Sequence, residues 1–284
     1  MIWPFFGAIA LAIGTVAEKL VLAKEKVSVK LYQVAQFLAI IIVMLPFLPF
    51  FWKVSPDFFT TKNILVFAGV IIFSVFANCF TFFSMKWERL GKLESAKITE
   101  PLFVILLSFI FSFIFGTALY GRNPNVLIPA IIAAAALIFS HIEKHHLKFN
   151  KYYLAALLGS FFFAIELILS RLILDNFNPI TFYFLRCAAI LVISLIFLRP
   201  KFHNNLNSRT ILQILGTGAI FFFYRIIVYF GYTNLGVIET TLTIMLGPVL
   251  IYFFAWKFLK NKLTWKQLVT AAIILGCVAY TIFI

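Results

Sequence analysis

The sequence predicts an all-α integral membrane protein, with ten transmembrane helices in two inverted five-helix repeats. Of its 284 residues, 63% are hydrophobic and only 12% are charged, whereas soluble domains carry roughly 25% charged residues. Apolar runs recur along the whole chain, and each is long enough as a helix to cross about 30 Å of hydrocarbon. The third observation is an internal similarity between early and late runs.

The apolar runs, each bounded by charged residues or by Gly and Pro, predict ten spans. Helices are the expected form because every span must satisfy its own backbone hydrogen bonds within lipid. No basic segment precedes the first run, so we expect a retained helix rather than a cleaved signal peptide. The connections are too short for a second domain, and one membrane domain is expected over residues 1–284. The spans are 2–23, 31–52, 64–86, 93–116, 124–142, 153–174, 179–198, 211–233, 237–257 and 267–284.

The internal similarity divides the chain into two halves. ERLGKLESAKITEPLFVILL (88–107) resembles TNLGVIETTLTIMLGPVLIYFF (233–254): each has Leu-Gly, a glutamate three residues later, a proline and an apolar run. KLVLAKEKVSVKLYQ (19–33) likewise resembles RLILDNFNPITFYFL (171–185). Chance similarity between apolar helices is the alternative. If the repeat is real, five spans per copy is an odd number, so the halves 1–145 and 146–284 are inverted relative to each other.

These features carry a family resemblance. Ten spans, the Leu-Gly and proline pattern of spans 4 and 9, and FLR at 184–186 resemble the EamA-type branch of the drug/metabolite transporter superfamily. The resemblance implies a secondary transporter, often an exporter, that moves small polar metabolites such as amino acids across the cell (inner) membrane by alternating access. One feature departs from it, because FGTALYG (115–121) and FLKNKLTW (258–265) lack the glutamate of the usual LGE.

Ionisable residues deep in the spans are the candidate site residues. With a rise of about 1.5 Å per residue, Glu166, Arg186 and Arg225 each fall roughly 20 Å from the face where span 1 ends, which we name face X. Each charge facing lipid would cost at least about 2.5–3.5 kcal/mol, so all three should face the bundle interior. Tyr229 shares the helix face of Arg225. We predict that these four residues bind substrate, and a purely structural ion pair is the alternative.

A second polar layer is expected nearer to face X. Glu18, Gln36, Asn78 and Glu100, on spans 1 to 4, fall roughly 7 to 12 Å from that face. Gln36 and Asn78 are predicted to bind substrate, and Glu18 and Glu100 to couple transport to protons. Glu100 directly precedes Pro101, which is expected to free a backbone carbonyl one turn earlier.

Other side chains of these spans have structural interpretations. Glu94 and Lys97, three residues apart, are expected near face X as an ion pair or as snorkelling residues. AAAA (133–136), and Ala272 with Gly276, form small faces suited to helix packing or to a homodimer.

No cofactor or metal site is predicted. The three cysteines lie in apolar runs without CxxC spacing, and HIEKHH (141–146) lacks the glutamate of an HExxH zinc site. The net charge of +14 comes from loop lysines and arginines, which indicates contact with anionic lipids rather than nucleic acid. A small-molecule substrate and the bilayer are the expected partners.

Two functions compete with transport of metabolites. One is a lipid-linked carrier flippase of the same fold. The other is an intramembrane enzyme acting on a lipid-linked substrate, for which the sequence offers no nucleophile, metal or phosphate motif.

Lysine and arginine are distributed unequally between the two faces. Seventeen of the 24 lie nearest to face X, whereas only Lys53, Lys62, Arg122 and Arg171 lie nearest to the opposite face, named Y. Because cytoplasmic loops carry an excess of these residues, face X is expected to be cytoplasmic and both termini outside. The family resemblance implies the opposite orientation. We favour the charges, because the bias extends over five loops of this chain.

Overall fold

The computed structural model describes residues 2–24, 27–88, 96–97, 99–120, 123–141, 150–200, 207–250 and 265–283, and these residues are almost entirely helical. Five helices among them are long and apolar enough to cross a membrane. They are α1 (Ile2–Leu22), α4 (Thr61–Trp87), α9 (Lys151–Ile173), α10 (Pro179–Leu198) and α11 (Ser208–Asn234). The chain is therefore a multi-pass membrane protein.

Shorter apolar helices occupy the remaining predicted spans: α2 (Val29–Met44), α6 (Thr99–Phe115), α8 (Pro124–His141), α12 (Val237–Ile244) and α14 (Trp265–Phe283). Single-turn segments α3 (Leu48–Phe51), η1 (Pro56–Phe59), α7 (Thr117–Tyr120) and η2 (Leu174–Asn176) lie in the connections. The end of the ninth predicted span, the region around Glu94, the segment 142–149 and Arg122 lie outside the described residues.

Polar side chains begin several of the helices. An Asn, Ser or Thr just before the first helical residue accepts a hydrogen bond from a first-turn N–H, which satisfies a donor that the helix itself cannot pair. Asn150 does this for Tyr153 at 2.8 Å, and Asn207 for Arg209 at 2.7 Å. Pro179 lies at the start of α10, where its ring fixes the backbone angle φ near the helical value. These caps interrupt the apolar sequence where the predicted spans meet.

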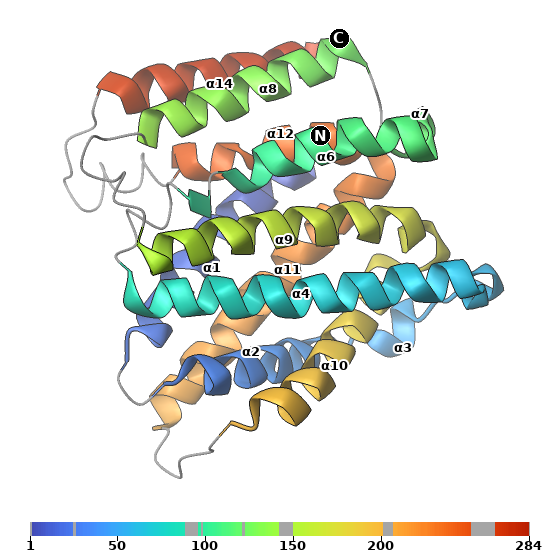
Figure 1. The fold of residues 1–284 in the computed structure, drawn as a ribbon, viewed down its shortest axis with the longest axis vertical. Coiled ribbons are helices and arrows are strands. Elements are labelled where there is room, and N and C mark those ends of the chain that lie inside the picture. The colour runs from blue at the N-terminus through green and yellow to red at the C-terminus, as the bar shows by residue number, and fades with distance from the viewer. Residues whose placement is uncertain are drawn as a thin grey trace.

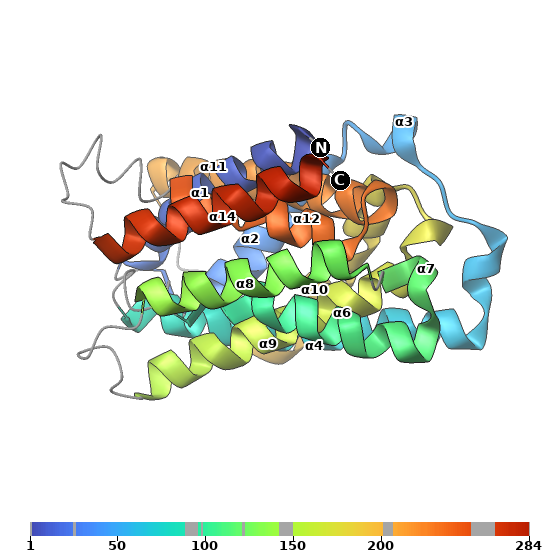
Figure 2. The same ribbon diagram turned by 90° about the horizontal axis from the view of Figure 1, so that it is seen from above.

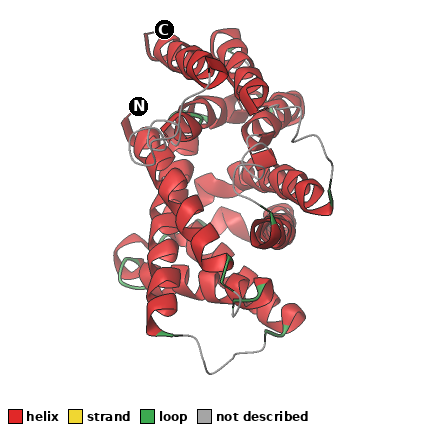
Figure 3. Cartoon of the chain, turned by 90° about the vertical axis from the view of Figure 1, so that its left-hand side faces the viewer, coloured by secondary structure: helices red, strands yellow, loops and turns green. Residues whose placement is uncertain are grey.

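The helices run alongside one another in one bundle. Figure 1 shows α8 with α14 at one end of the long axis and α2 with α10 at the other, with α1, α4, α9 and α11 between them. Figure 3 views the helices nearly end-on. The start of α1 and the end of α14 lie toward the same side as α3 and α7, which is face Y (Figure 2).

The most extensive packing joins the two halves of the chain: α4 packs on α9, and α1 on α11. Glycine permits close approach at the α4–α9 crossing and at the contact of α11 with α2. A Cβ added to Gly159 of α9 would lie 2.5 Å from Thr81 Oγ1, and one added to Gly218 of α11 would lie 2.9 Å from Ala39 Cβ of α2. The central core therefore depends on contacts between residues far apart in sequence.

The two small-residue faces differ in their surroundings. Ala133 and Ala134 are fully buried in a cluster between α8, α12 and α14, so the AAAA stretch packs inside the chain. Ala272 is exposed, and a Cβ added to Gly276 would meet nothing within 4 Å. The second small face is therefore not a packing face within the described residues.

At face X, α1 and α4 cap each other's ends. Lys19 Nζ of α1 donates to the Met85 carbonyl and, at 2.6 Å, to the Glu88 carbonyl after α4. Lys86 Nζ of α4 donates to the carbonyls of Leu22, Lys24 and Val27, the last at 2.6 Å. Both lysines satisfy carbonyls that lack intrahelical partners and complement the negative ends of the helix dipoles.

At face Y, the connections of the two halves are joined. Val54 and Phe177 form an isolated antiparallel bridge, and Ser55 N donates to Asn176 O at 2.7 Å. Below the bridge, Phe58 packs edge-on against Phe177, with ring centroids 4.7 Å apart. Nothing in the apolar pattern of either loop predicts this pairing.

Gly216 and Gly218, two residues apart on α11, provide a matched test of the α2–α11 crossing. Gly218→Ala should destabilise the protein by about 1–3 kcal/mol, because the new methyl overlaps Ala39 and its backbone. Gly216→Ala meets open space and should be neutral or stabilising by up to about 1 kcal/mol through higher helix propensity. Thermal unfolding in detergent measures both; equal melting temperatures for the two variants would contradict the crossing.

The charge distribution generates a topology prediction. A green fluorescent protein fused after Ile284 should be dark in a bacterial host, because both termini are expected outside and the exported reporter does not mature. The same reporter inserted between Asn204 and Asn205, in the connection after α10 at face X, should fluoresce. Fluorescence of the fused whole cells is the measurement, and a bright C-terminal fusion with a dark loop insertion would reverse the assignment.

Candidate functional site

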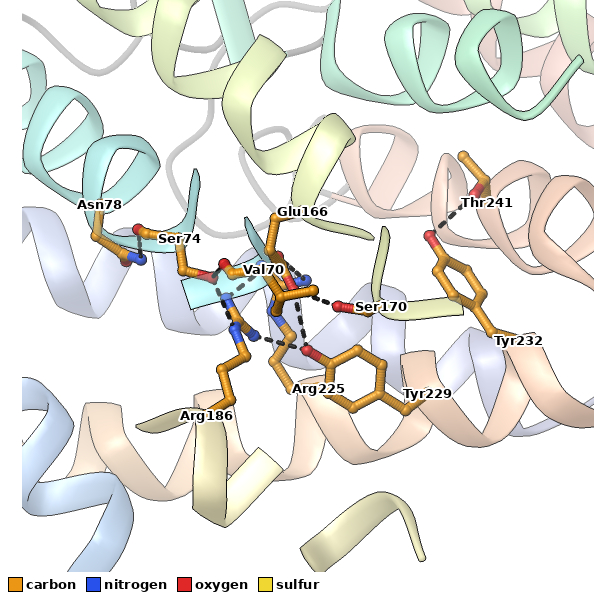
Figure 4. A network of polar contacts seen from close by, with 10 residues as sticks. All are labelled: Val70, Ser74, Asn78, Glu166, Ser170, Arg186, Arg225, Tyr229, Tyr232 and Thr241. Atoms are coloured by element: carbon orange, nitrogen blue, oxygen red, sulfur yellow. Dashed lines mark hydrogen bonds and ion pairs between the residues drawn. The ribbon is translucent and has the colours of Figure 1, made fainter. Parts of the chain in front are cut away.

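One carboxylate is shared by two arginines in the centre of the bundle. Glu166 Oε2 of α9 lies 3.1 Å from Arg186 Nη2 of α10 and 3.6 Å from Arg225 Nη1 of α11. The Tyr229 hydroxyl accepts a hydrogen bond from Arg186 Nη1 at 2.7 Å and donates to Glu166 Oε1 at 3.1 Å. Figure 4 shows these side chains pointing toward one another from three helices. The residues that the sequence places at one depth are thus in direct contact.

Small polar side chains complete this network. Ser170 Oγ donates to Glu166 Oε1 at 3.0 Å, and Arg186 Nε donates to Ser74 Oγ of α4 at 2.9 Å. Asn78 Nδ2 donates to the Ser74 carbonyl at 2.7 Å (Figure 4). Sequence reasoning missed both serines. The available signal is their spacing, since each lies four residues from a predicted site residue on the same helix face.

Aromatic rings surround the guanidinium groups. The Arg225 guanidinium carbon lies 5.3 Å from the ring centroid of Phe163 and 5.7 Å from that of Tyr224, and Arg186 lies 5.8 Å from that of Tyr183. Such faces attract cations electrostatically and shield them from lipid. Arg186 and Arg225 can therefore be buried, with only 2% and 7% of their surfaces exposed, respectively.

A cavity of about 90 Å³ lies against the two arginines. Its wall includes both arginines and four of the residues predicted in the second polar layer: Glu18, Gln36, Asn78 and Glu100. Residues of both predicted polar layers therefore line one cavity, although the two layers come from different halves of the chain. Thr217 Oγ1 donates to Gln36 Oε1 at 2.8 Å, which orients that amide.

Glu166 and Tyr229 do not line this cavity. Both are 0% exposed and lie behind the arginines, which occupy the wall. All three charged residues face the bundle interior as expected, and Arg186 and Arg225 separate Glu166 from the cavity in this conformation. The physical reason is that Glu166 needs both arginines to offset its desolvation, and they enclose it.

A second cavity, of about 130 Å³, adjoins the first and shares Lys97, Glu100 and Tyr224 in its wall. The prolines of the repeated motif, Pro101 and Pro248, both line it, one from each half. α12 ends at Ile244 and helical structure resumes at Leu246, so the ninth predicted span has a one-residue irregularity at Met245, shortly before Pro248.

Two expectations for the start of the fourth span need correction. Lys97 is not an interfacial residue, because it lines both cavities next to Glu100. α6 begins at Thr99, so Pro101 lies in its first turn, where a missing N–H removes no intrahelical bond. The start of the predicted span, residues 93–95, lies outside the described residues. Glu94, the expected partner of Lys97, lies outside the described residues.

The charges of the cavity walls are mixed. Lys97, Arg186 and Arg225 supply three positive groups, whereas Glu18 and Glu100 supply two carboxylates, with Glu166 behind the arginines as a third. The site therefore has no net charge when all six groups are ionised. Such a surface is suited to a solute that carries both signs of charge.

The described residues show no cluster of three or more His, Cys, Asp or Glu that could hold a metal ion. Cys79 Sγ donates to Gln33 Oε1 at 3.1 Å, Cys187 is buried, and Cys277 is half-buried. Most of the histidine-rich segment 141–146 lies outside the described residues.

Comparisons with known proteins agree with this architecture. A protein of known crystal structure matches with a TM-score of 0.69 and 16% identity, over 99% of this chain and 95% of that chain, and at this identity the likeness shows the fold alone. No curated protein matches the sequence. The model of the EamA-like transporter family matches residues 150–283, which contain α9, α10, α11, α12 and α14 and hence both central arginines. Residues 150–283 therefore match the EamA-like transporters, a family of membrane transporters in the drug/metabolite transporter superfamily.

Proposed function

We propose that the chain is a secondary transporter, and specifically an exporter, of small metabolites that carry a carboxylate and an amine, such as amino acids. The observation that carries this proposal is a pair of buried arginines and two carboxylates, Glu18 and Glu100, in the wall of one cavity between the halves. Guanidinium groups bind carboxylates with two parallel hydrogen bonds, and Glu18 and Glu100 are placed to accept an ammonium group.

The two arginines have different roles in this proposal. Each nitrogen of Arg186 already has a partner, since Nε binds Ser74, Nη1 binds Tyr229 and Nη2 binds Glu166. Arg225 has one ion pair, at 3.6 Å, and makes no hydrogen bond to the residues that the structure describes. Arg225 therefore retains donors for a substrate, and Arg186 holds Glu166 in place.

The packing supports ten spans in two inverted repeats, 1–145 and 146–284. The contact of span 3 with span 6 (α4 with α9) has its counterpart in the contact of span 8 with span 1 (α11 with α1). The pairs α2–α10 and α8–α14 each join one position of the repeat to its equivalent. Exchanging the halves leaves this pattern unchanged, as a two-fold axis in the membrane plane requires. Two such halves can rock about a shared site and give alternating access.

Proton coupling is the proposed energy source. Glu100 lines both cavities, and Glu18, which is 3% exposed, lines the one that contains the arginines. Carboxylates in the interior of a membrane bundle commonly mark proton routes, and these two can release a proton as a substrate ammonium arrives. The carboxylates thus link substrate binding to the proton gradient of the cell (inner) membrane.

A lipid-linked carrier flippase is the competing function. It would favour arginines along a groove open to lipid, whereas Arg186 and Arg225 are enclosed by aromatic rings and helices. Members of the EamA-like family are transporters rather than enzymes, which also disfavours an intramembrane enzyme.

Ligand-dependent stability tests the substrate class. Among amino acids, their amides and their deaminated analogues, a zwitterion should raise the melting temperature, because a ligand that binds only the folded state adds about 2.7 kcal/mol at 100 times its Kd. Arg225→Gln should abolish this shift. Arg209→Gln, at the exposed start of the same helix, is the matched control and should retain it. Stabilisation by polyprenyl-phosphate carriers but by no zwitterion would favour the flippase.

The role of Glu166 can be separated from substrate binding. Glu166→Gln leaves two buried arginines without their carboxylate and should cost about 3–5 kcal/mol of stability without any ligand present. Adding Arg186→Gln should restore part of that loss, because one unpaired charge is then removed. Thermal unfolding of the single and double variants gives the coupling, with Asp175→Asn, whose carboxylate is exposed, as control. A Glu166→Gln variant as stable as the parent would contradict a structural role.

A further inference from the structure

A third cavity, of about 280 Å³, lies at the Y end of the bundle, outside the site described above. Its wall is formed where α9 and α11 end and α8 and α12 begin, and it includes Asn123, Arg171, Tyr232, Gly236 and Glu239. Tyr232 is also in the wall of the 130 Å³ cavity, and its hydroxyl lies 3.5 Å from Thr241 Oγ1 (Figure 4). This tyrosine therefore stands between the central cavities and the cavity at face Y.

Arg171 is the cation in the described part of this wall, and its donors are largely unused. The residue is 7% exposed, and its guanidinium has one partner among the described residues: Asp175 Oδ2, 2.8 Å from Nη1. Its Nε is buried without a hydrogen bond. An arginine has five N–H donors, and leaving buried donors unpaired is costly. Arg186 shows the contrast, since all three of its nitrogens have partners.

The start of α12 adds a second source of positive potential. Its N-cap is Gly236, with φ at 98°, so no side chain accepts from the first-turn N–H groups. Uncapped N–H groups at a helix start attract anions. Glu239 is the carboxylate in the described part of the wall, and it is half-buried in the first turn of α12 itself. The described wall thus combines the Arg171 guanidinium, the N–H groups at the start of α12 and one carboxylate.

We propose that this cavity is a second carboxylate-binding site, in which Arg171 and the first turn of α12 hold the carboxylate of a small solute at face Y. Asp175 occupies only Nη1 of Arg171 and leaves the remaining donors for the ligand. Tyr232 separates a solute here from the central arginines. The site stands on its own geometry and does not depend on which solute crosses the membrane.

The test uses sodium acetate as the probe and protection of a single thiol as the readout. Asn234→Cys places the thiol in the cavity wall, in the full chain with Cys79, Cys187 and Cys277 each replaced by alanine. The rate of its modification by the neutral reagent N-ethylmaleimide is compared in acetate and in chloride at equal ionic strength. Acetate should slow the reaction roughly threefold, and Arg171→Gln should abolish the difference, because a hydrogen bond to a charged group is lost.

Asp175→Asn is the matched variant and gives an independent result. It frees Arg171 Nη1, so protection by acetate should become stronger. If Arg171→Gln does not fold, the comparison of Asp175→Asn with the parent protein still tests the site. Equal rates in acetate and chloride, protection that survives in Arg171→Gln, or protection that is unchanged or weaker in Asp175→Asn would each overturn the site. Because no transport is measured, the proposed function is unaffected by these outcomes.

Discussion

The ion cluster of Glu166 with Arg186 and Arg225 is the interaction on which the centre of the molecule depends. A single carboxylate holds two cations in an apolar bundle, where an unpaired charge would cost several kcal/mol. Through Ser74 and Tyr229 the cluster joins α4 and α11 to α9 and α10. The same contacts that hold these helices in register also position Arg225 in the cavity wall with donors unused. The same charged residues therefore contribute to the stability of the bundle and to the proposed binding of a substrate.

Much of this cluster could be predicted from the sequence. The rise per residue in a helix is fixed, so counting from the ends of spans places Glu166, Arg186 and Arg225 at one depth. What counting cannot give is the rotation of each helix about its own axis. That rotation decides that Glu166 lies behind the arginines, and it follows from packing between helices far apart in the chain.

The two halves contribute different chemistry to the shared cavities. The second half, where the family match lies, supplies both arginines and their carboxylate. The first half supplies Glu18, Gln36, Asn78, Lys97 and Glu100 to the wall. The two halves thus line the cavity with different charged and polar side chains.

The exchange of lysine caps between α1 and α4 bears on how the molecule can move. Lys19 and Lys86 tie the two helix ends together, and Asn150 Nδ2 adds α9 by donating to Glu88 Oε2 at 2.6 Å. Three helices from both halves thus form a stiff corner at face X. A rocking motion about the cluster would carry this corner as one rigid body, and bending must then fall where the backbone is already interrupted. Met245, the one turn residue between the helical residues Ile244 and Leu246 in the ninth predicted span, is such a place.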